Sequence, residues 1–494
     1  MSLDLLTHPR WLTEDLGLPM PDDPHAVSAC LPLWRHNVGY EEGDAAVLNA
    51  LQAAYPRFRF HPKILELCSE QLDGPGCKGL PFASEKAARR AIAYVTASGG
   101  TVDRTASIGG DAVGVIVPDD SFPHLKQYWQ HAGENLSSRS AELLLNGKAA
   151  TCTEISERKL CRERVAALHA TPVDRVFLFP SGMAAIACAW RIVQQVSSGP
   201  TCQFGFPYVD TLKIQQRFPN SQHVFYPVGN QAELEQFAIQ CESSPPVAVF
   251  CEVPTNPLLG SPDLPGLRQL ADKYNFLLVV DDTLGACQNL NVAPFADLIV
   301  TSLTKYFSGY GNVLAGSLVV PTQGKRQHEL ATAITDEFEE TLADCDARVL
   351  AENSADLNVR IPRINDSANQ LAEFLALQPA VASVFYPSQD CTNYEAIRKP
   401  GGGFGGLLSI VLKEPQSTTT AMFDALRVCK GPNLGTNFTL CCPYTILAHY
   451  DELPFAETCG VSRWLLRISV GMEPIEDLKQ RFLAAFQKLA GTNR

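Results

Sequence analysis

The sequence has no excess of positive charge. It carries 40 lysines and arginines against 53 aspartates and glutamates, which gives a net charge of -13 and a pI near 5.3. A nucleic-acid-binding surface needs clustered lysine and arginine to neutralise phosphates, so this balance argues against nucleic acid as a partner. Hydrophobic residues make up 46% of the chain and charged residues 19%, as is typical of a soluble globular protein.

Long hydrophobic runs and targeting signals are also missing. FLLVV (276–280) is one of the longer apolar stretches, far short of the roughly 20 residues that a membrane helix needs. The N-terminus, MSLDLLTHPRWLTEDLGLPMPDD, has no basic segment followed by an apolar run, so it does not resemble a secretory signal. We therefore expect a cytoplasmic protein with no membrane partner.

The 16 cysteines lack the spacing of a disulfide framework or a metal site. No Cys-x-x-Cys pair occurs, and Cys441 and Cys442 are adjacent, which disfavours a shared metal ion. We expect reduced cysteines and no metal, as in a cytosolic protein. Nucleotide phosphate loops are missing too: Gly147-Lys148 is followed by alanine, and GYGNVLAG lacks the glycine spacing of a dinucleotide fingerprint.

Three regions follow one another along the chain. Residues 1–135 mix turns with short amphipathic segments, and the Gly/Ser/Thr-rich stretch at 97–110 reads as an exposed loop. Residues 136–375 alternate apolar strands with helices, which is typical of an α/β sheet. Residues 376–494 have an α+β pattern. We therefore predict an N-terminal extension, a large domain and a smaller C-terminal domain.

Three apolar runs in the large domain end in polar side chains. These runs, VAVFCEVP, FLLVVDD and ADLIVTS, are apolar on both faces and fit buried parallel strands. Ligands of open α/β sheets bind beyond the carboxyl ends of the strands. The polar residues expected to converge there are Glu252, Asn256, Asp281, Asp282, Ser302, Thr304 and Lys305.

A turn of small residues adds a fourth element. FPSGMAA (179–185) puts Ser181 and Gly182 at the start of a helix, where N–H groups and the helix dipole favour a phosphate. A lysine amine, a carboxylate and a phosphate site are what pyridoxal phosphate requires, because the lysine forms a Schiff base and the carboxylate keeps the pyridine nitrogen protonated. Each feature alone also fits a solvated lysine, a turn or a helix cap. Their order at successive strand ends favours a cofactor site around Lys305.

The same stretches resemble a known family. PSGMAA, EVPTNPLL, VVDDT, SLTKYFSGYGNVLAG and LLRISVGMEPIEDL look like the motifs of the Cys/Met-metabolism pyridoxal-phosphate enzymes, from about residue 160 to the end. Upstream, AYPRFRFH and WQHAGENLSSRSAE are similar to fungal-type cystathionine γ-synthases. The resemblance implies the α/β architecture of fold type I. That is a mostly parallel central sheet with helices on both faces, followed by a small α+β C-terminal domain.

The resemblance also implies roles for individual residues. Lys305 would be the Schiff-base lysine and proton shuttle. Asp281 would partner the pyridine nitrogen, and Asp282 stands where the family usually has asparagine. Arg467 would bind the substrate α-carboxylate, a bidentate task that suits arginine, and Asn433 lies nearby where serine is usual. The other implied cofactor contacts are Ser181, Gly182, Met183, Asn256, Ser302 and Thr304.

Two positions depart from the family pattern. The ring-stacking tyrosine is represented by Phe204, which can stack but offers no hydroxyl, so Lys305 would carry most proton transfers, with Tyr208 as a second candidate. The Tyr-x-Arg arm that binds phosphate from a neighbouring subunit is matched by 137–139 or, further upstream, by 55–57. We favour Arg139 over the alternative of Tyr55 with Arg57. A shared site implies a homodimer or homotetramer.

The implied activity is γ-replacement on an O-acyl-L-homoserine such as O-acetylhomoserine. Elimination of the acyl group gives a vinylglycine-type ketimine, to which a nucleophile adds. The resemblance makes L-cysteine the nucleophile and cystathionine the product, as in amino-acid biosynthesis. Asn433 keeps open a carbon or nitrogen nucleophile, as in fungal specialised metabolism, and a γ-lyase or O-acylhomoserine sulfhydrylase is a third reading. A non-enzymatic scaffold is disfavoured because Lys305, Asp281 and Arg467 are all present.

Overall fold

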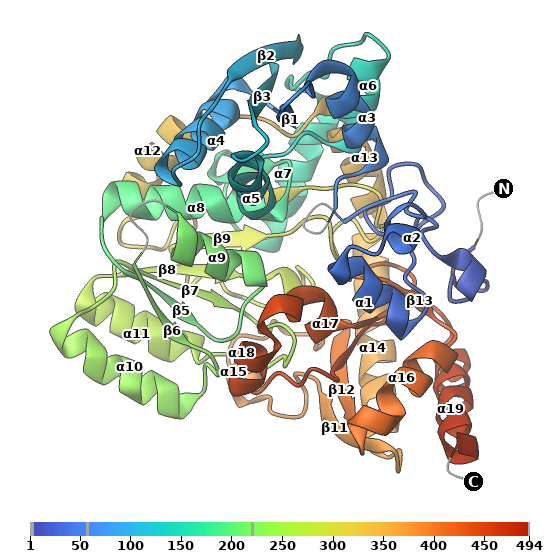
Figure 1. Ribbon diagram of the computed structural model, residues 1–494. Coiled ribbons are helices and arrows are strands. Elements are labelled where there is room, and N and C mark those ends of the chain that lie inside the picture. Colours follow the sequence, from blue (N-terminus) through green and yellow to red (C-terminus); the bar gives the residue numbers. More distant parts are fainter. Residues whose placement is uncertain (1–3, 56–58, 219–221, 493–494) are drawn as a thin grey trace.

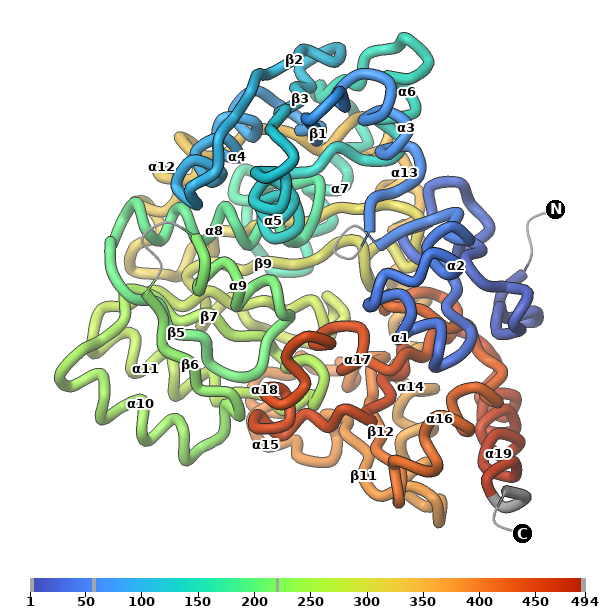
Figure 2. Tube along the Cα trace, in the orientation of Figure 1, coloured from blue at the N-terminus to red at the C-terminus, as the bar shows by residue number. Residues whose placement is uncertain are grey.

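The computed structural model describes residues 4–55, 59–218 and 222–492 (Figures 1 and 2). Within these ranges the strands form three sheets, each from a different part of the chain. No helix there is long and apolar enough to cross a membrane. The same ranges hold no group of three or more His, Cys, Asp or Glu side chains that could bind a metal ion.

The first sheet is antiparallel, with the strand order β1-β3-β2. Its edge strand β2 falls inside 97–110, so the predicted loop is wrong there. The reason is that most residues of β2 face solvent, which hides the apolar alternation expected of a strand. The elements of this N-terminal unit are β1 (Cys77–Phe82), β2 (Arg104–Gly109), β3 (Ala112–Pro118), α1 (Trp34–Glu42), α2 (Ala45–Leu48), α3 (Pro62–Gln71), α4 (Glu85–Ala97), α5 (Phe122–Ala132) and α6 (Ser138–Leu145).

The central sheet has the order β4-β10-β9-β8-β7-β5-β6. Strands β5 to β9 run parallel to one another, whereas β10 runs antiparallel to β4 and β9. Its strands are β4 (Val176–Phe179), β5 (Thr201–Phe204), β6 (His223–Tyr226), β7 (Ala248–Glu252), β8 (Leu277–Asp281), β9 (Leu298–Thr301) and β10 (Gly316–Val319). The sheet is mostly parallel, in agreement with the α/β class predicted from the sequence.

Helices cover both faces of the central sheet. Side chains of α8 share one hydrophobic cluster with one set of strand residues, and those of α7, α10 and α11 share another with the alternate set. Figure 1 shows α8 and α9 on one side and α10 and α11 on the other. The helices of this part are α7 (Ser156–Leu168), α8 (Gly182–Val196), α9 (Val209–Arg217), α10 (Gln231–Ser243), α11 (Leu264–Tyr274), α12 (Gln327–Glu337) and α13 (Asp344–Asn353).

The third sheet is built from the C-terminal part, in the order β11-β12-β15-β14-β13. It carries a core of its own against α14 and α19. The elements are β11 (Val381–Phe385), β12 (Leu407–Leu412), β13 (Cys429–Lys430), β14 (Leu440–Pro443), β15 (Leu466–Ser469), α14 (Leu357–Ala376), α15 (Thr392–Glu395), α16 (Pro415–Ala425), α17 (Tyr444–His449), α18 (Leu453–Thr458) and α19 (Ile475–Thr492).

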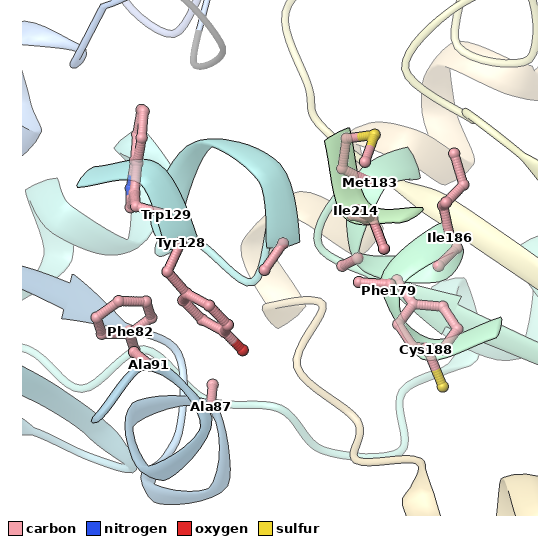
Figure 3. Close-up of a cluster of buried hydrophobic side chains, with 14 of the residues drawn as sticks. Phe82, Ala87, Ala91, Tyr128, Trp129, Phe179, Met183, Ile186, Cys188 and Ile214 are labelled. Carbon is pink, nitrogen blue, oxygen red and sulfur yellow. The ribbon is translucent and has the colours of Figure 1, made fainter. Parts of the chain in front are cut away.

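The N-terminal unit is packed onto the central sheet. Figure 3 shows side chains of one hydrophobic cluster, in which Phe82, Tyr128 and Trp129 of that unit join Phe179 at the end of β4 and Met183 at the start of α8. All five side chains are buried, with at most 9% of their surface exposed. Burial of this size contributes on the order of 2 kcal/mol per large side chain, so the unit is fixed in place beside α8. The domain boundaries at 135 and 375 stay a prediction.

Candidate active site

The parallel strands β7, β8 and β9 deliver their polar ends to one pocket. Glu252 at the end of β7 is the Cα partner of Asp281 at the end of β8, and the chain continues from β9 through Ser302 to Lys305. Because parallel strands end at the same edge of the sheet, the side chains converge there. The residues named from the sequence that line this pocket are Tyr55, Ser181, Gly182, Met183, Tyr208, Glu252, Asn256, Asp281, Ser302, Thr304, Lys305 and Arg467.

Lys305 is almost fully buried at the centre of the site, with 7% of its surface exposed. Its Nζ donates hydrogen bonds to Tyr55 Oη at 2.8 Å and to Asn433 Oδ1 at 2.6 Å. Burial lowers the pKa of the Lys305 amine, and the nearby charge of Arg467 lowers it further, while Tyr55 opposes the shift. A lowered pKa makes the neutral amine more available as a nucleophile and a base.

The N-terminus of α8 forms one end of the pocket. Ser181 caps the helix, because its Oγ accepts a hydrogen bond from Ala184 N at 3.0 Å. The same hydroxyl donates to Gly133 O at 2.7 Å, so it is already engaged. A Cβ at Gly182 would lie 2.8 Å from Ser302 Cβ, so only glycine fits there. The first N–H groups of the helix have no partner within it, which suits an anion such as a phosphate.

The two hydroxyl residues after β9, Ser302 and Thr304, differ in whether the side-chain hydroxyl is already engaged in hydrogen bonds within the protein. Thr304 Oγ1 accepts a hydrogen bond from Ala315 N at 3.0 Å and donates to Ala315 O at 3.2 Å. Its hydroxyl therefore holds the backbone of the site in place. Ser302 lies directly beside Gly182, and its backbone N donates to Thr283 Oγ1 at 2.8 Å. Ser302 is the hydroxyl placed to join the helix N-terminus in binding an anion.

Two buried carboxyl groups lie side by side in the pocket. Burial and the charge of Asp281 raise the pKa of Glu252 well above its usual range, while the hydrogen bond from the backbone of Tyr208 opposes the shift. Burial raises the pKa of Asp281 less, because hydrogen bonds from Thr283 oppose the shift. Asp281 is thus the carboxylate that can pair with a buried N–H cation such as a protonated pyridine.

Asp282 does not line this pocket. Its Oδ1 accepts a hydrogen bond from Thr301 Oγ1 at 2.6 Å, and its Oδ2 lies 3.8 Å from His169 Nε2. Burial raises the pKa of Asp282 to about 6 and lowers that of His169 to about 3. The second aspartate of the pair is a buried structural neighbour of the site.

Arg467 on β15 presents its guanidinium from the C-terminal sheet. Its Nη1 donates to Asn256 Oδ1 at 3.3 Å and its Nη2 to Pro432 O at 2.8 Å. The ring of Tyr444 lies 4.8 Å from the guanidinium carbon. These contacts fix the orientation of a fork that can take a carboxylate. Asn433 lies between the lining residues Pro432 and Leu434 and contacts Lys305 directly.

Phe204 is a predicted site residue that the structure does not bring to the pocket. It is fully buried in the core and packs against Tyr226 and Phe237, with ring centroids 5.8 and 5.9 Å away. Side chains alternate along a strand, and position 204 in β5 faces α10. Tyr208 lines the pocket instead, and its backbone N donates to the carboxyl of Glu252. The prediction that Phe204 stacks on the cofactor ring therefore disagrees with this geometry.

Arg139 lies in a neighbouring, smaller cavity. Its Nη1 is 3.2 Å from Asp346 Oδ1 and its Nη2 is 3.9 Å from Asp23 Oδ2. Tyr55, of the alternative motif, lines the pocket of its own chain, whereas Arg57 lies outside the described residues. Within one chain the geometry favours Tyr55, and a role for Arg139 in a neighbouring subunit stays a prediction.

Sequence reasoning missed most of the pocket wall that comes from the N-terminal unit. Gln130, Gly133 and Asn135 lie in the lining together with Tyr55. The stretch WQHAGENLSS had been noted for its resemblance, but nothing in it indicates contact with residues about 170 positions away.

The residue set fits pyridoxal phosphate. A buried lysine, a buried carboxylate and a helix N-terminus face one pocket. Two amide atoms at its edge, Asn433 Nδ2 and Asn135 Oδ1, are buried and have no hydrogen-bond partner among the described residues. A ligand or a water in the pocket can supply the hydrogen bonds that these two atoms lack.

The chain belongs to the Cys/Met metabolism PLP-dependent enzymes, because the model of that family matches residues 153–487. The model of the fungal trans-sulfuration enzyme N-terminal domain matches residues 62–137. The resemblance noted in the sequence is therefore confirmed, and so are the fold type I architecture and the cofactor. The protein is a PLP-dependent, cystathionine γ-synthase-like enzyme of the γ-substitution and elimination type.

Individual relatives agree with this assignment. The chain is 33% identical to the cystathionine gamma-synthase of Neurospora crassa, over 96% of this chain and 98% of the relative. It is 34% identical to a cystathionine gamma-synthase-like enzyme of Amanita muscaria, over 95% and 97%. The crystal structure of cystathionine gamma synthase from Xanthomonas oryzae in complex with cystathionine matches with a TM-score of 0.58 and 25% identity, covering 69% of this chain and 87% of that one.

Proposed function

We propose that this enzyme catalyses γ-replacement on an O-acyl-L-homoserine, with L-cysteine as the first nucleophile to test and cystathionine as the product. The observation that carries the proposal is one pocket that joins the buried amine of Lys305 to the oriented guanidinium of Arg467. An amino-acid substrate offers its carboxylate to the arginine and its α-proton to the lysine. The similarity to the Neurospora crassa and Xanthomonas oryzae enzymes supports the choice of cysteine.

The residues of the pocket divide the work as follows. Arg467 binds the α-carboxylate in a bidentate manner. The amine of Lys305 takes the proton from Cα, and its flexible four-carbon stem lets it also reach the protons on Cβ. Loss of the γ-acyloxy group then leaves Cγ open to a nucleophile. Pyridoxal phosphate, when bound, supplies the electron sink for the carbanion. Asp281, Ser302 and the N-terminus of α8 would hold it.

A second candidate function is γ-replacement with an uncharged carbon nucleophile. It is favoured by the mostly apolar side chains that line the pocket near Arg467. These side chains are Leu434, Cys442, Tyr444, Leu447 and Ala448. Among the described residues, the cations that line the pocket are Lys305 and Arg467. Since Arg467 is assigned to the first substrate, a second carboxylate, such as that of cysteine, finds no further cation there. Burying an unpaired carboxylate costs free energy, and an uncharged nucleophile would bind without that cost.

The deciding experiment is a competition between nucleophiles. The holoenzyme is incubated with O-acetyl-L-homoserine, L-cysteine and a β-keto ester as a carbon acid, and the products are identified by mass spectrometry. Cystathionine supports the leading proposal, and incorporation of the carbon acid supports the second candidate. Release of 2-oxobutanoate without incorporation of either would identify a γ-lyase. Lys305→Ala serves as the control for uncatalysed products.

We also propose that the enzyme is cytoplasmic and at least a homodimer. The support is the family arrangement, in which a phosphate arm crosses between subunits, together with the reduced state expected of the cysteines. Light scattering of the purified holoenzyme measures the assembly, and a monomer at micromolar concentration would contradict the proposal.

A further inference from the structure

The segment between α5 and α6 forms part of the pocket wall. The pocket that holds Lys305 is lined by Gly133 and Asn135 of this segment and by Gln130 near the end of α5. They belong to the N-terminal unit, whose hydrophobic core is continuous with that of α8 (Figure 3). The unit therefore contributes to the site as well as to the fold.

Gly133 brings this segment against the N-terminus of α8. It caps α5 in the left-handed conformation, with φ +65°. A Cβ there would lie 2.5 Å from Ser181 Oγ and 2.6 Å from Met183 Cβ. Its carbonyl oxygen also accepts the hydrogen bond from Ser181 Oγ at 2.7 Å. The backbone at 133–135 thus lies directly beside the turn that is assigned to the phosphate.

Asn135 is held at this place with an unsatisfied amide. Its backbone forms an antiparallel bridge with Phe82, and 9% of the residue surface is exposed. Its Oδ1 is buried and has no hydrogen-bond partner in the described part of the chain. An unpaired buried polar group of this kind costs about 1–3 kcal/mol. Asn135 lies in the lining of the pocket that holds Lys305, and it also lines the smaller cavity that holds Arg139.

The neighbouring polar residues are already paired. Gln130 Nε2 donates to Asp210 Oδ1 at 3.4 Å. The carboxylate of Glu134 accepts hydrogen bonds from Arg90, Arg191 and Tyr128, and Glu134 does not line the pocket. Asn135 is therefore the neutral group of this segment that is left to meet a ligand.

We propose that Asn135 is a further binding residue for the phosphate group of the cofactor. The oxygen and nitrogen of an asparagine amide exchange places by a half-turn of the side chain. The unsatisfied position can then hold Nδ2, which donates to a phosphate oxygen beside Ser302 and the N-terminus of α8. The donor comes from the N-terminal unit, so this unit takes part directly in cofactor binding.

The test compares two forms of the cofactor, with and without phosphate. Pyridoxal phosphate and pyridoxal are titrated into the apoenzyme, and binding is followed by absorbance at the Schiff-base band. Hydrogen bonds to charged groups contribute about 1.5–3 kcal/mol, so Asn135→Ala is expected to raise the Kd of pyridoxal phosphate about 10- to 100-fold. The Kd of pyridoxal is expected to stay within about twofold, because it carries no phosphate.

Two charged variants sharpen this comparison. Asn135→Asp adds a negative charge at the proposed contact and is expected to weaken pyridoxal phosphate binding more than Asn135→Ala does. Gln130→Glu adds the same charge to the same wall and is expected to have a smaller effect. Equal losses for pyridoxal phosphate and pyridoxal, or equal losses in the two charged variants, would overturn the proposal. Asn135→Ser replaces Asn135→Ala if the latter does not fold. The substrate plays no part in these titrations, so their outcome is independent of the proposed reaction.

Discussion

The amine of Lys305 donates a hydrogen bond of 2.6 Å to the side-chain oxygen of Asn433. The contact joins the catalytic strand end of the central sheet to the C-terminal part of the chain, 128 residues later. It involves a position where the resembled family usually has serine. The side chain of asparagine is longer than that of serine, so its oxygen can reach the amine of Lys305. Asn433, which is expected to lie near the substrate carboxylate, therefore contacts the lysine directly.

Substitution of Asn433 is expected to change the pH dependence of the reaction. Asn433→Asp places a carboxylate beside the amine and raises the pKa of Lys305, so the acidic limb of the kcat profile moves to higher pH. Asn433→Ala removes an acceptor that favours the ammonium form, so this limb moves to lower pH. Both variants are expected to lower the maximal kcat by about 10- to 100-fold through loss of positioning. Shifts in the same direction for the two variants would contradict this account.

Asp281 is expected to destabilise the protein when no cofactor is bound. Burial raises the pKa of its carboxyl in the folded state, whereas the unfolded value is near 4. The folded state therefore holds the proton more tightly, and stability is lost as the pH rises from about 4 through the raised folded value. Asp281→Asn removes the ionisable group. We expect the apo variant to gain about 1–2 kcal/mol at pH 8, and nothing at pH 4.

Asp282→Asn is the matched control for this experiment. Burial also raises the pKa of Asp282, so the apo variant should gain stability at pH 8 in the same direction. Asp282 does not line the pocket, so its loss should leave cofactor affinity nearly unchanged. Asp281→Asn should weaken that affinity by about tenfold or more. Urea unfolding of the apoenzymes and absorbance titration with pyridoxal phosphate measure the two quantities.

The sequence was sufficient for the part of the site that lies at the strand ends. Apolar runs identify β7, β8 and β9, and parallel strands bring Asp281, Ser302 and Lys305 to one edge without further information. The same reasoning does not predict on which face of the sheet a side chain of a short strand lies. Phe204 ends a four-residue strand that is buried on both faces, so its apolar alternation gives no sign of which face holds the pocket.

Contacts between distant segments were the other part that sequence could not supply. Tyr55 meets Lys305 across 250 positions, and Asn135 meets the same pocket through the packing of the N-terminal unit on α8. These placements depend on how two hydrophobic cores join, and no local pattern encodes that arrangement. From sequence, the motif around Tyr55 is separated from that around Arg139 only by its position further upstream, which carries no information about contact with Lys305.

Substitutions at Tyr55 and Arg139 separate the two candidate arms. Tyr55→Phe removes the hydroxyl that contacts the amine of Lys305 and is expected to lower kcat with little loss of stability. Arg139→Met leaves Asp346, whose side chain is 3% exposed, without its partner and is expected to cost about 3 kcal/mol. The ratio of pyridoxal phosphate affinity to pyridoxal affinity in Arg139→Met decides between the two arms. A fall in that ratio would identify Arg139 as the phosphate arm, and an unchanged ratio would favour Tyr55.

A network of four charges, all of them largely but not fully buried, joins the N-terminal unit to α8. Glu134 Oε1 accepts from Arg90 Nη1 and Arg191 Nη2 at 2.8 Å each, and Glu337 pairs with the same two arginines. The side chains are between 10% and 18% exposed. Two positive and two negative charges thus balance among residues of α4, α8, α12 and the segment after α5.

Neutralising one acid of this network should be costly. Glu134→Gln leaves two buried arginines with one carboxylate and is expected to lower the free energy of unfolding by about 3–5 kcal/mol, as measured by urea denaturation. Glu337→Gln should cost a similar amount, and the double variant should cost less than the sum, because the four groups form one network. Since Glu134 lies between Gly133 and Asn135, its loss should shift this segment and weaken the binding of pyridoxal phosphate more than that of pyridoxal, which has no phosphate for Asn135 to contact. A cost below about 1 kcal/mol, which is typical of exposed pairs, would show that the charges are solvated and that hydrophobic packing alone holds the unit.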